Sequence, residues 1–146
     1  MMEDSVNAYL ISSCRNNGTS DVQVTMTMCI DNNPESTMTR LLTGFGITNQ
    51  RADLLAIKWA LDIFKEKEVI NIYSRSQYAV NCVTIWGEQW RSNNWSSSSS
   101  KNIKNVDIIK SILDTIILLR EERKSINIIF VNKNNQNEAI QSIECN

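Results

Sequence analysis

The sequence predicts a single mixed α/β domain, and its length, composition and hydrophobic periodicity lead to that prediction. The chain has 146 residues, which is the size of one ordinary domain and too few for two. Hydrophobic residues make up 42% of the chain and charged residues 21%, so it can form a packed core. Segments with the two-residue period of a strand alternate with segments that have the period of a helix. The predicted order of elements is βββαβα, then an irregular loop, then αβα.

The first part of the chain predicts an antiparallel meander of three strands. Residues 6–14 predict a short strand, and the Asn16-Asn17-Gly18 sequence that follows is a strong turn signal. Residues 21–30 alternate apolar and polar side chains, which is typical of a strand with one buried face. A turn is expected at 31–34, and a third strand over 38–44 completes the meander.

Helices and two further strands are expected in the rest of the chain. Leu54, Ile57 and Leu61 recur at helical spacing, and either Thr48 or Asn49 can cap the helix that contains them. The predicted elements are, in order, a helix over 49–65, a strand over 69–74, a helix over 76–85, an irregular Ser-rich segment over 86–101, a helix over 105–121, a strand over 126–131 and a short helix over 137–144.

The composition excludes several classes of protein. The chain has no histidine, which excludes every mechanism that uses an imidazole as base, acid or metal ligand. No apolar run approaches the roughly 20 residues of a membrane span, and the acidic residues 1–5 do not resemble a signal peptide, so no membrane partner is expected. The formal net charge of −1 argues against binding of polyanions by bulk charge alone, although it allows a local basic groove.

The cysteines point to a reducing environment. Cys14, Cys29, Cys82 and Cys145 are not paired at the C-x-x-C spacing of zinc ligands. Without a secretory signal, we expect free and partly buried thiols. The expected location is therefore an intracellular, reducing compartment, and the sequence does not distinguish cytoplasm from nucleus.

Four segments carry motifs in a set order: TNQRADLLA at 48–56, IYSRSQYAVN at 72–81, WGEQWRSNNW at 86–95 and KNVD at 104–107. This succession resembles cellular ribonuclease H of the eukaryotic type, whose TNxRAE, YTDSQY, W-x-x-x-W-x-x-N-G-W and V-x-N-x-D/E segments come in the same order. Weaker matches extend the resemblance to residues 9–18 and 137–139. The resemblance implies one ribonuclease H-like domain over residues 1–146, with a five-stranded mixed sheet flanked by helices.

The resemblance also implies an activity, from which this sequence departs. The family cleaves the RNA strand of RNA–DNA hybrids, with two magnesium ions held between four carboxylates and the scissile phosphate. The four carboxylate positions fall here on Ile11, Asp53, Arg75 and Ile140. One carboxylate of the four remains, and Arg75 is expected to pair with Asp53 and to repel a cation. We therefore predict a protein that is not an enzyme, with a site unable to hold the metal ions and with no other cofactor.

Residues that the family uses to hold nucleic acid are retained together. The resemblance assigns a pocket for a DNA-strand phosphate to Thr48 and Asn105, a minor-groove contact to Asn49 and Gln50, and the DNA-strand channel to Trp90 and Ser98.

Each of these assignments has a structural alternative. Asn49 and Asn105 can both be helix caps, which is the commoner task of asparagine at a helix start. Trp86 is expected to pack in the core, whereas Trp90 suits the core and a nucleic-acid contact equally well.

Three functions follow from the lost and the retained residues. The favoured one is residual or altered binding of an RNA–DNA hybrid or another duplex by an inactive protein. The alternative is a protein-interaction or architectural module of a larger viral or nucleic-acid-processing assembly, which the net charge of −1 favours because hybrid binders usually present a basic face. An active hybrid ribonuclease is the third, and it needs other acids to replace the lost ligands. The candidates are Asp31, Glu35, Asp107 and Glu138, whose spacing places no two beside Asp53.

Overall fold

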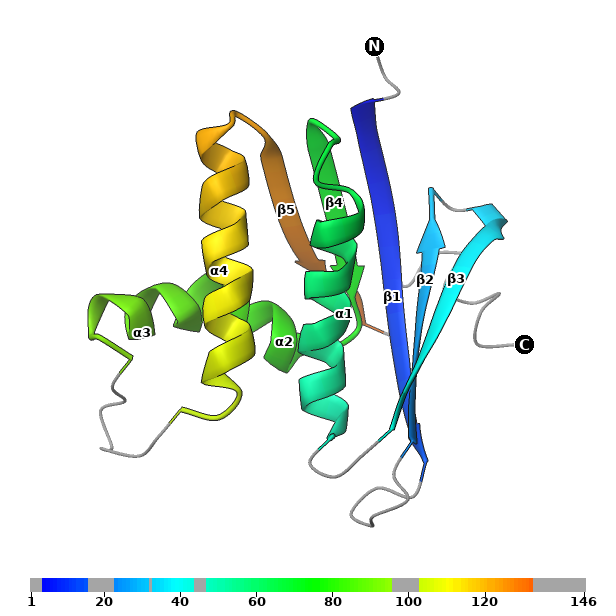
Figure 1. Cartoon of the computed structure of the whole chain (residues 1–146), viewed down its shortest axis with the longest axis horizontal. Coiled ribbons are helices and arrows are strands. Elements are labelled where there is room, and N and C mark those ends of the chain that lie inside the picture. The colour runs from blue at the N-terminus through cyan, green and yellow to red at the C-terminus, as the bar shows by residue number, and fades with distance from the viewer. Residues whose placement is uncertain (1–3, 16–22, 32, 44–46, 96–102, 133–146) are drawn as a thin grey trace.

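Five strands form one mixed sheet in the computed structural model (Figure 1). The structure describes residues 4–15, 23–31, 33–43, 47–95 and 103–132. The sheet has the order β3-β2-β1-β4-β5, with the bounds Ser5–Arg15 for β1, Gln23–Ile30 for β2, Asn33–Thr43 for β3, Val69–Ser74 for β4 and Ser125–Phe130 for β5. The predicted five-stranded mixed sheet is thereby confirmed.

The register of the strands leaves one edge of β1 open at its end. β1, β2 and β3 form the predicted antiparallel meander, and β4 and β5 continue the sheet in parallel with β1. The last pair between β1 and β4 is Leu10 with Ser74, so residues 11–15 of β1 run past the end of β4. The chain leaves β1 toward β2 on one side, while β4 lies on the other side. Such a divergence at the carboxyl ends of parallel strands is a common place for a binding site.

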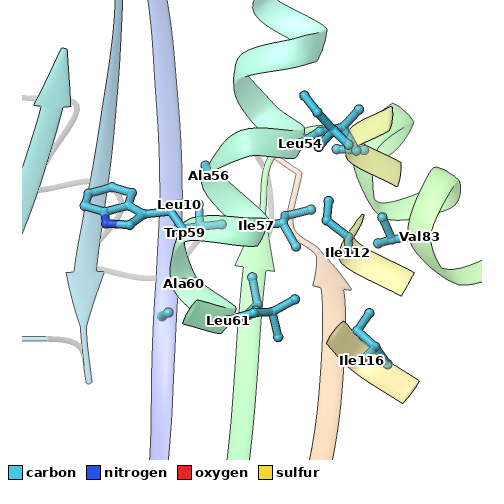
Figure 2. Packing of buried hydrophobic residues seen from close by; sticks show 14 of the residues in the cluster. Leu10, Leu54, Ala56, Ile57, Trp59, Ala60, Leu61, Val83, Ile112 and Ile116 are labelled. Carbon is cyan, nitrogen blue, oxygen red and sulfur yellow. The ribbon is translucent and has the colours of Figure 1, made fainter. Parts of the chain in front are cut away.

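Two long helices lie together on one face of the sheet (Figure 1). α1, Asn49–Ile63, packs on β1, β2 and β4, and α4, Val106–Glu121, packs on α1 and β5. In the core between them, Ile57 and Leu61 of α1 point toward Ile112 and Ile116 of α4 (Figure 2). Burial of such an aliphatic side chain contributes about 1.5–3 kcal/mol, and this apolar contact holds α1 against α4.

A helical segment of three parts follows β4. α2, Gln77–Asn81, passes into a π-helical turn η2, Cys82–Trp86, and then into α3, Gly87–Ser92. The prediction of an irregular segment from residue 86 is therefore wrong for 86–92. Gly87 allows the helix to continue close to α4, because a Cβ atom there would collide with the carbonyl oxygen of Cys82 and lie 2.9 Å from Cδ1 of Leu113.

The other boundaries differ less from the expectation. β3 begins at Asn33, so the turn predicted over 31–34 ends earlier than expected. β3 is an edge strand, and an edge strand tolerates a proline because one of its sides has no ladder partner. The helix predicted over 137–144 lies outside the described residues.

No helix in the described part of the chain is long and apolar enough to cross a membrane. Cys29 and Cys82 are buried, Cys14 is half-buried, and all three are free thiols. Cys145 lies outside the described residues.

Candidate functional site

A pocket of about 710 Å³ opens where β1 runs past the end of β4. Ile11, Asp53 and Arg75 all line it, so the structure brings together three of the four positions at which the resemblance places carboxylates. The fourth position, Ile140, lies outside the described residues. The full lining consists of Leu10, Ile11, Ser12, Ser13, Cys14, Thr25, Thr27, Asn49, Asp53, Arg75 and Ser76.

Asp53 holds its carboxylate between β1 and the start of α2. The carboxylate accepts hydrogen bonds from the hydroxyls of Ser12 and Ser76. Ser76 is also the N-cap of α2, where its Oγ accepts from the backbone N–H of Ala79 at 3.1 Å. Burial raises the pKa of Asp53, and the two hydroxyl hydrogen bonds lower the pKa by less than burial raises it.

The prediction that Arg75 forms an ion pair with Asp53 is wrong. Ion pairs in the described part of the chain join Arg51 to Asp107, Lys58 to Asp62 and Lys124 to Glu122, and none includes Asp53. The physical reason is that α1 presents the carboxylate to two serine hydroxyls that already satisfy it. Arg75 lines the same pocket from the bend after β4.

The described residues of the pocket lining do not fit a pair of magnesium ions. Magnesium prefers hard anionic oxygens, and two adjacent dications need several of them. Within the described residues, no group of three or more acidic, cysteine or histidine side chains could hold a metal. Asp107 is paired with Arg51, and Asp31 accepts a hydrogen bond from the backbone N–H of Asn7. Neither aspartate lines the pocket.

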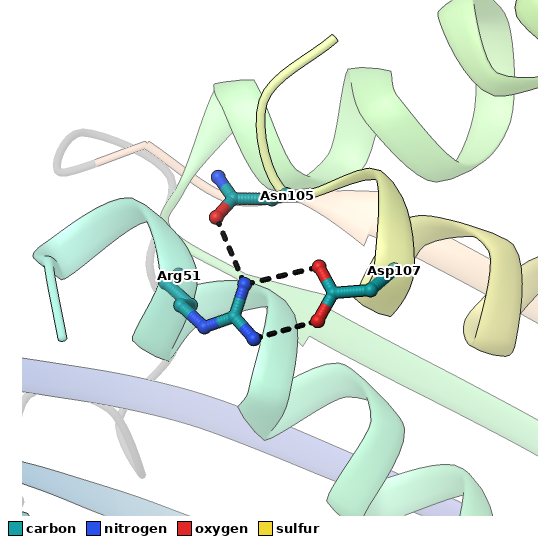
Figure 3. Close-up of polar contacts among 3 residues, drawn as sticks. All are labelled: Arg51, Asn105 and Asp107. Atoms are coloured by element: carbon teal, nitrogen blue, oxygen red, sulfur yellow. Dashed lines mark hydrogen bonds and ion pairs between the residues drawn. The ribbon is translucent and has the colours of Figure 1, made fainter. Parts of the chain in front are cut away.

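A second cluster joins the start of α1 to the start of α4 (Figure 3). The guanidinium of Arg51 donates from Nη1 and Nη2 to the carboxylate of Asp107, at 3.1 and 2.7 Å. Nη1 also donates to Oδ1 of Asn105 at 3.3 Å, and Nδ2 of Asn105 donates to the Tyr78 hydroxyl at 3.1 Å. The hydrogen bond with Asp107 raises the pKa of Arg51, and the same bond lowers the pKa of Asp107. Both groups are therefore charged at neutral pH.

The structure tests the capping role that was considered for each helix-start residue. Thr48 is the N-cap of α1, because its Oγ1 accepts from the backbone N–H of Arg51 at 3.1 Å, so Asn49 is not the cap. Asn105 precedes α4 in the left-handed conformation, with φ of 60°, and its side chain makes no capping hydrogen bond. Thr48 and Asn105 both contact Arg51, so the two residues assigned to a phosphate pocket lie at one junction.

An aromatic group adjoins this junction. The ring of Trp86 lies 6.4 Å from that of Tyr78 and 6.1 Å from that of Trp90. Trp86 is 36% exposed, so the prediction that it packs in the core is wrong. Trp90 is half-buried and packs against the core from α3, and Ser98 lies outside the described residues.

Sequence reasoning missed two residues of this junction, Arg51 and Tyr78. Both stand inside the motifs that carry the resemblance, Arg51 in TNQRAD and Tyr78 in SQY. Their place beside the assigned residues in these motifs was the available signal, but only the fold shows that they hold Asn105 from two sides.

Solved structures of the same architecture define the class of the domain. The chain superposes on the foamy viral protease-reverse transcriptase in complex with dsDNA with a TM-score of 0.72 at 20% identity, over 88% of this chain and 81% of that one. It superposes on the PFV RNase H domain with a TM-score of 0.62 at 15% identity, over 96% of this chain and 87% of that one. The fold is therefore RNase H-like.

The sequence match gives the family. The family model described as RNase H matches residues 3–140, and the chain belongs to this family. Ribonuclease H of Chlorobium limicola is 39% identical over 85 residues, which are 56% of this chain and 58% of that protein. Ribonuclease HI of Haemophilus influenzae is 45% identical over 64 residues, which are 44% of this chain and 42% of that protein. The chain thus spans about half the length of the curated relatives it matches.

Proposed function

We propose that this RNase H-family domain binds an RNA–DNA hybrid, or a related duplex, without hydrolysing the RNA strand. The observation that carries the proposal is the pocket at the end of β1, whose described lining contains one carboxylate, Asp53, together with the guanidinium of Arg75. Four carboxylates would bring a charge of about −4 to two magnesium ions. Asp53 and Arg75 together bring a charge near zero, so the lining gives little electrostatic support to a pair of dications.

Support for binding comes from the donors at the start of α1 and α4. The hydroxyl oxygen of Thr48 accepts from the Arg51 N–H, which leaves its own proton to be donated to a phosphate. Asn105 donates one N–H of its amide to Tyr78, and the other has no acceptor among the described residues. The exposed ring of Trp86 beside Tyr78 offers a surface on which a base or sugar can stack.

The structural neighbours agree with a nucleic-acid partner. Two of them are the foamy viral protease-reverse transcriptase in complex with dsDNA and with an RNA/DNA hybrid, and the second superposes with a TM-score of 0.66 at 17% identity, over 97% of this chain and 18% of that one. We propose the same class of partner for the present chain, because the hydrogen-bond donors of Thr48 and Asn105 lie at the same junction as the rings of Tyr78 and Trp86.

An anisotropy titration tests the binding proposal. Labelled RNA–DNA hybrid, duplex DNA and duplex RNA are titrated at two salt concentrations, with magnesium and with EDTA. We expect hybrid binding that weakens with salt, since phosphate contacts supply most of the affinity, and that persists in EDTA. Absence of salt-dependent binding to all three at about 10⁻⁴ M protein, the weak end of non-specific affinity, would end this proposal and favour a protein-interaction module.

The names of the curated relatives favour hydrolysis as a second candidate function. Hydrolysis requires carboxylates beyond those of the described lining, and Glu138 is such an acid. A cleavage assay with Asp53→Asn and Glu138→Gln separates the two candidates, because both variants would lose a metal-dependent activity.

A further inference from the structure

A hydrogen-bonded bridge connects three elements where β1 runs past the end of β4. Asp53 of α1 accepts hydrogen bonds from Ser12 of β1 and from Ser76, the N-cap of α2. We propose that this carboxylate bridge positions the side-chain amide of Asn105 for nucleic acid, so that its three residues act on binding without touching the duplex. The inference deepens the proposed function and rests on it for the nucleic-acid contact.

The carboxylate bridge closes a gap in the sheet. The last pair between β1 and β4 is Leu10 with Ser74, so Ser12 lies beyond the last residue of β4. Ser74 is buried, and its Oγ accepts from the backbone N–H of Ser76 at 3.1 Å. The start of α2 is thereby tied to the end of β4, and Asp53 ties it in turn to α1 and to β1.

The bridge and the junction described above connect the same two helices. Asp53 lies two residues after Arg51 in α1, and Ser76 lies two residues before Tyr78 in α2. Arg51 donates to Oδ1 of Asn105 (Figure 3), and Nδ2 of Asn105 donates to the Tyr78 hydroxyl. The spacing between the starts of α1 and α2 therefore sets how the Asn105 amide is held. The hydrogen bond between Asp53 and Ser76 fixes that spacing.

The orientation of this amide decides what it can bind. One N–H of Asn105 is donated to Tyr78, and the other has no acceptor among the described residues. A hydrogen bond weakens steeply when its angle falls below about 120°, so a rotated amide loses a ligand oxygen. Hydrogen bonds to a carboxylate are shorter and stronger than those between neutral groups, which makes Asp53 an effective anchor. The positioning requires no metal ion, so it should operate in EDTA.

Substitution of Ser12 tests the bridge at its β1 end, outside the helices that form the junction. Ser12→Ala removes a donor to Asp53, whereas Ser12→Thr keeps a hydroxyl on a residue that is favoured in strands. Ser111→Ala is the matched control, because this exposed serine of α4 is no part of the bridge. Ser76→Asp is a second variant at the α2 end, since aspartate keeps the N-cap and removes the hydroxyl donor.

Fluorine NMR of protein labelled with 5-fluorotryptophan reports on the junction without a ligand. The ring of Trp86 lies 6.4 Å from that of Tyr78, so a displaced Tyr78 will shift the Trp86 signal, which Trp86→Phe identifies. The signal of the buried Trp59 shows whether each variant is folded. We expect the Trp86 signal to move in Ser12→Ala and in Ser76→Asp, to return toward the wild-type position in Ser12→Thr and to stay in Ser111→Ala.

Anisotropy titration with hybrid in EDTA gives the second readout. We expect Ser12→Ala to weaken binding about threefold to tenfold, as loss of coupling through a hydrogen-bond network does, and Ser12→Thr to restore it. Asn105→Gly keeps the left-handed backbone and removes the amide. In that background Ser12→Ala should weaken binding less, whereas independent sites would give additive losses.

The outcomes separate this inference from the proposed function. A shifted Trp86 signal in folded Ser12→Ala, with no hybrid binding by the wild type, would support the positioning of Asn105 and contradict the proposed function. A Trp86 signal that stays in place in both folded bridge variants overturns the inference. Hybrid affinity that is equal in the wild type and Ser12→Ala, or losses that add with Asn105→Gly, also overturn it while the proposed function stands.

Discussion

A half-buried carboxylate with a shifted pKa dominates the chemistry of the pocket at the scale of single residues. Asp53 is held by α1 against two serine hydroxyls, and burial raises its pKa above the ordinary value. The folded chain therefore binds this proton more tightly than the unfolded chain does. The protonated carboxyl therefore stabilises the folded chain at low pH, and this stabilisation is lost as pH rises through the raised pKa.

We expect Asp53→Asn to raise the melting temperature at neutral pH, because asparagine keeps an acceptor for the serines and carries no charge. The gain should shrink as pH falls through the raised pKa of Asp53 and should vanish below the ordinary aspartate pKa of about 3.9, where aspartic acid and asparagine are both neutral at this position. Thermal unfolding followed by circular dichroism over this range measures the difference, with the exposed Asp114→Asn as control. A gain that does not depend on pH would contradict the account.

Asn105 makes a second prediction at this scale, because it combines a left-handed backbone with two side-chain hydrogen bonds. Both Asn105→Gly and Asn105→Ala lose those hydrogen bonds, but alanine adds the strain of a Cβ atom in the left-handed region. We expect the alanine variant to be less stable than the glycine variant by about 1 kcal/mol in urea unfolding. Equal stability of the two variants would show that the backbone is not held in this conformation.

Motif positions in the sequence predicted the neighbours in the pocket but not their partners. Ile11, Asp53 and Arg75 each fall on a motif position, so their meeting could be expected. The hydrogen bonds of Asp53 could not, because the choice between Ser12 and Arg75 depends on how the side chains are oriented in the folded pocket. The prediction that Trp86 is buried also failed, because aromatic character alone does not say whether a ring faces the core or the solvent.

At the scale of elements, periodicity predicted the strands and the two long helices well. It failed over 86–92, where a glycine and several polar residues indicated a loop and the chain continues as η2 and α3. A π-helical turn shifts the face of the helix, so a fixed 3.6-residue period cannot follow it. The third strand also began earlier than predicted, because turn-forming residues can occupy an edge strand.

Gly87 tests whether close packing sets this helical segment. Its φ is −59°, so the backbone itself accepts any residue, and the constraint is the contact of a new Cβ atom with Cys82 and Leu113. We expect Gly87→Ala to lower the free energy of unfolding by about 1–3 kcal/mol, as overpacking does elsewhere. Its exposed neighbour Glu88→Ala should change stability by less than about 0.5 kcal/mol, and chemical denaturation compares the two. An equal effect of both substitutions would rule out the packing explanation.

At the scale of the whole molecule, a formal net charge of −1 gives no bulk attraction to a polyanion, so the affinity depends on local contacts, and stacking on an exposed ring is one of them. Trp86 is the cleanest probe, because it is more exposed than Trp90 and its loss disturbs the core less. We expect Trp86→Ala to weaken hybrid binding by about 1–3 kcal/mol in the anisotropy titration with little change in melting temperature. Leu118→Ala, an exposed apolar residue near the far end of α4, should leave the affinity unchanged, and equal affinities for all three proteins would remove Trp86 from the interface.

Whether the protein cleaves the RNA strand of a bound hybrid tests the central claim most directly. Hybrid with a labelled RNA strand is incubated with saturating protein in magnesium or in manganese, and the strand is resolved on a denaturing gel beside the Asp53→Asn and Glu138→Gln variants. The account predicts that the hybrid is bound and that the RNA stays intact with all three proteins, because the described pocket offers one carboxylate and a guanidinium to a pair of dications. Metal-dependent cleavage by the wild type that disappears in Asp53→Asn would contradict it and make this chain an active ribonuclease.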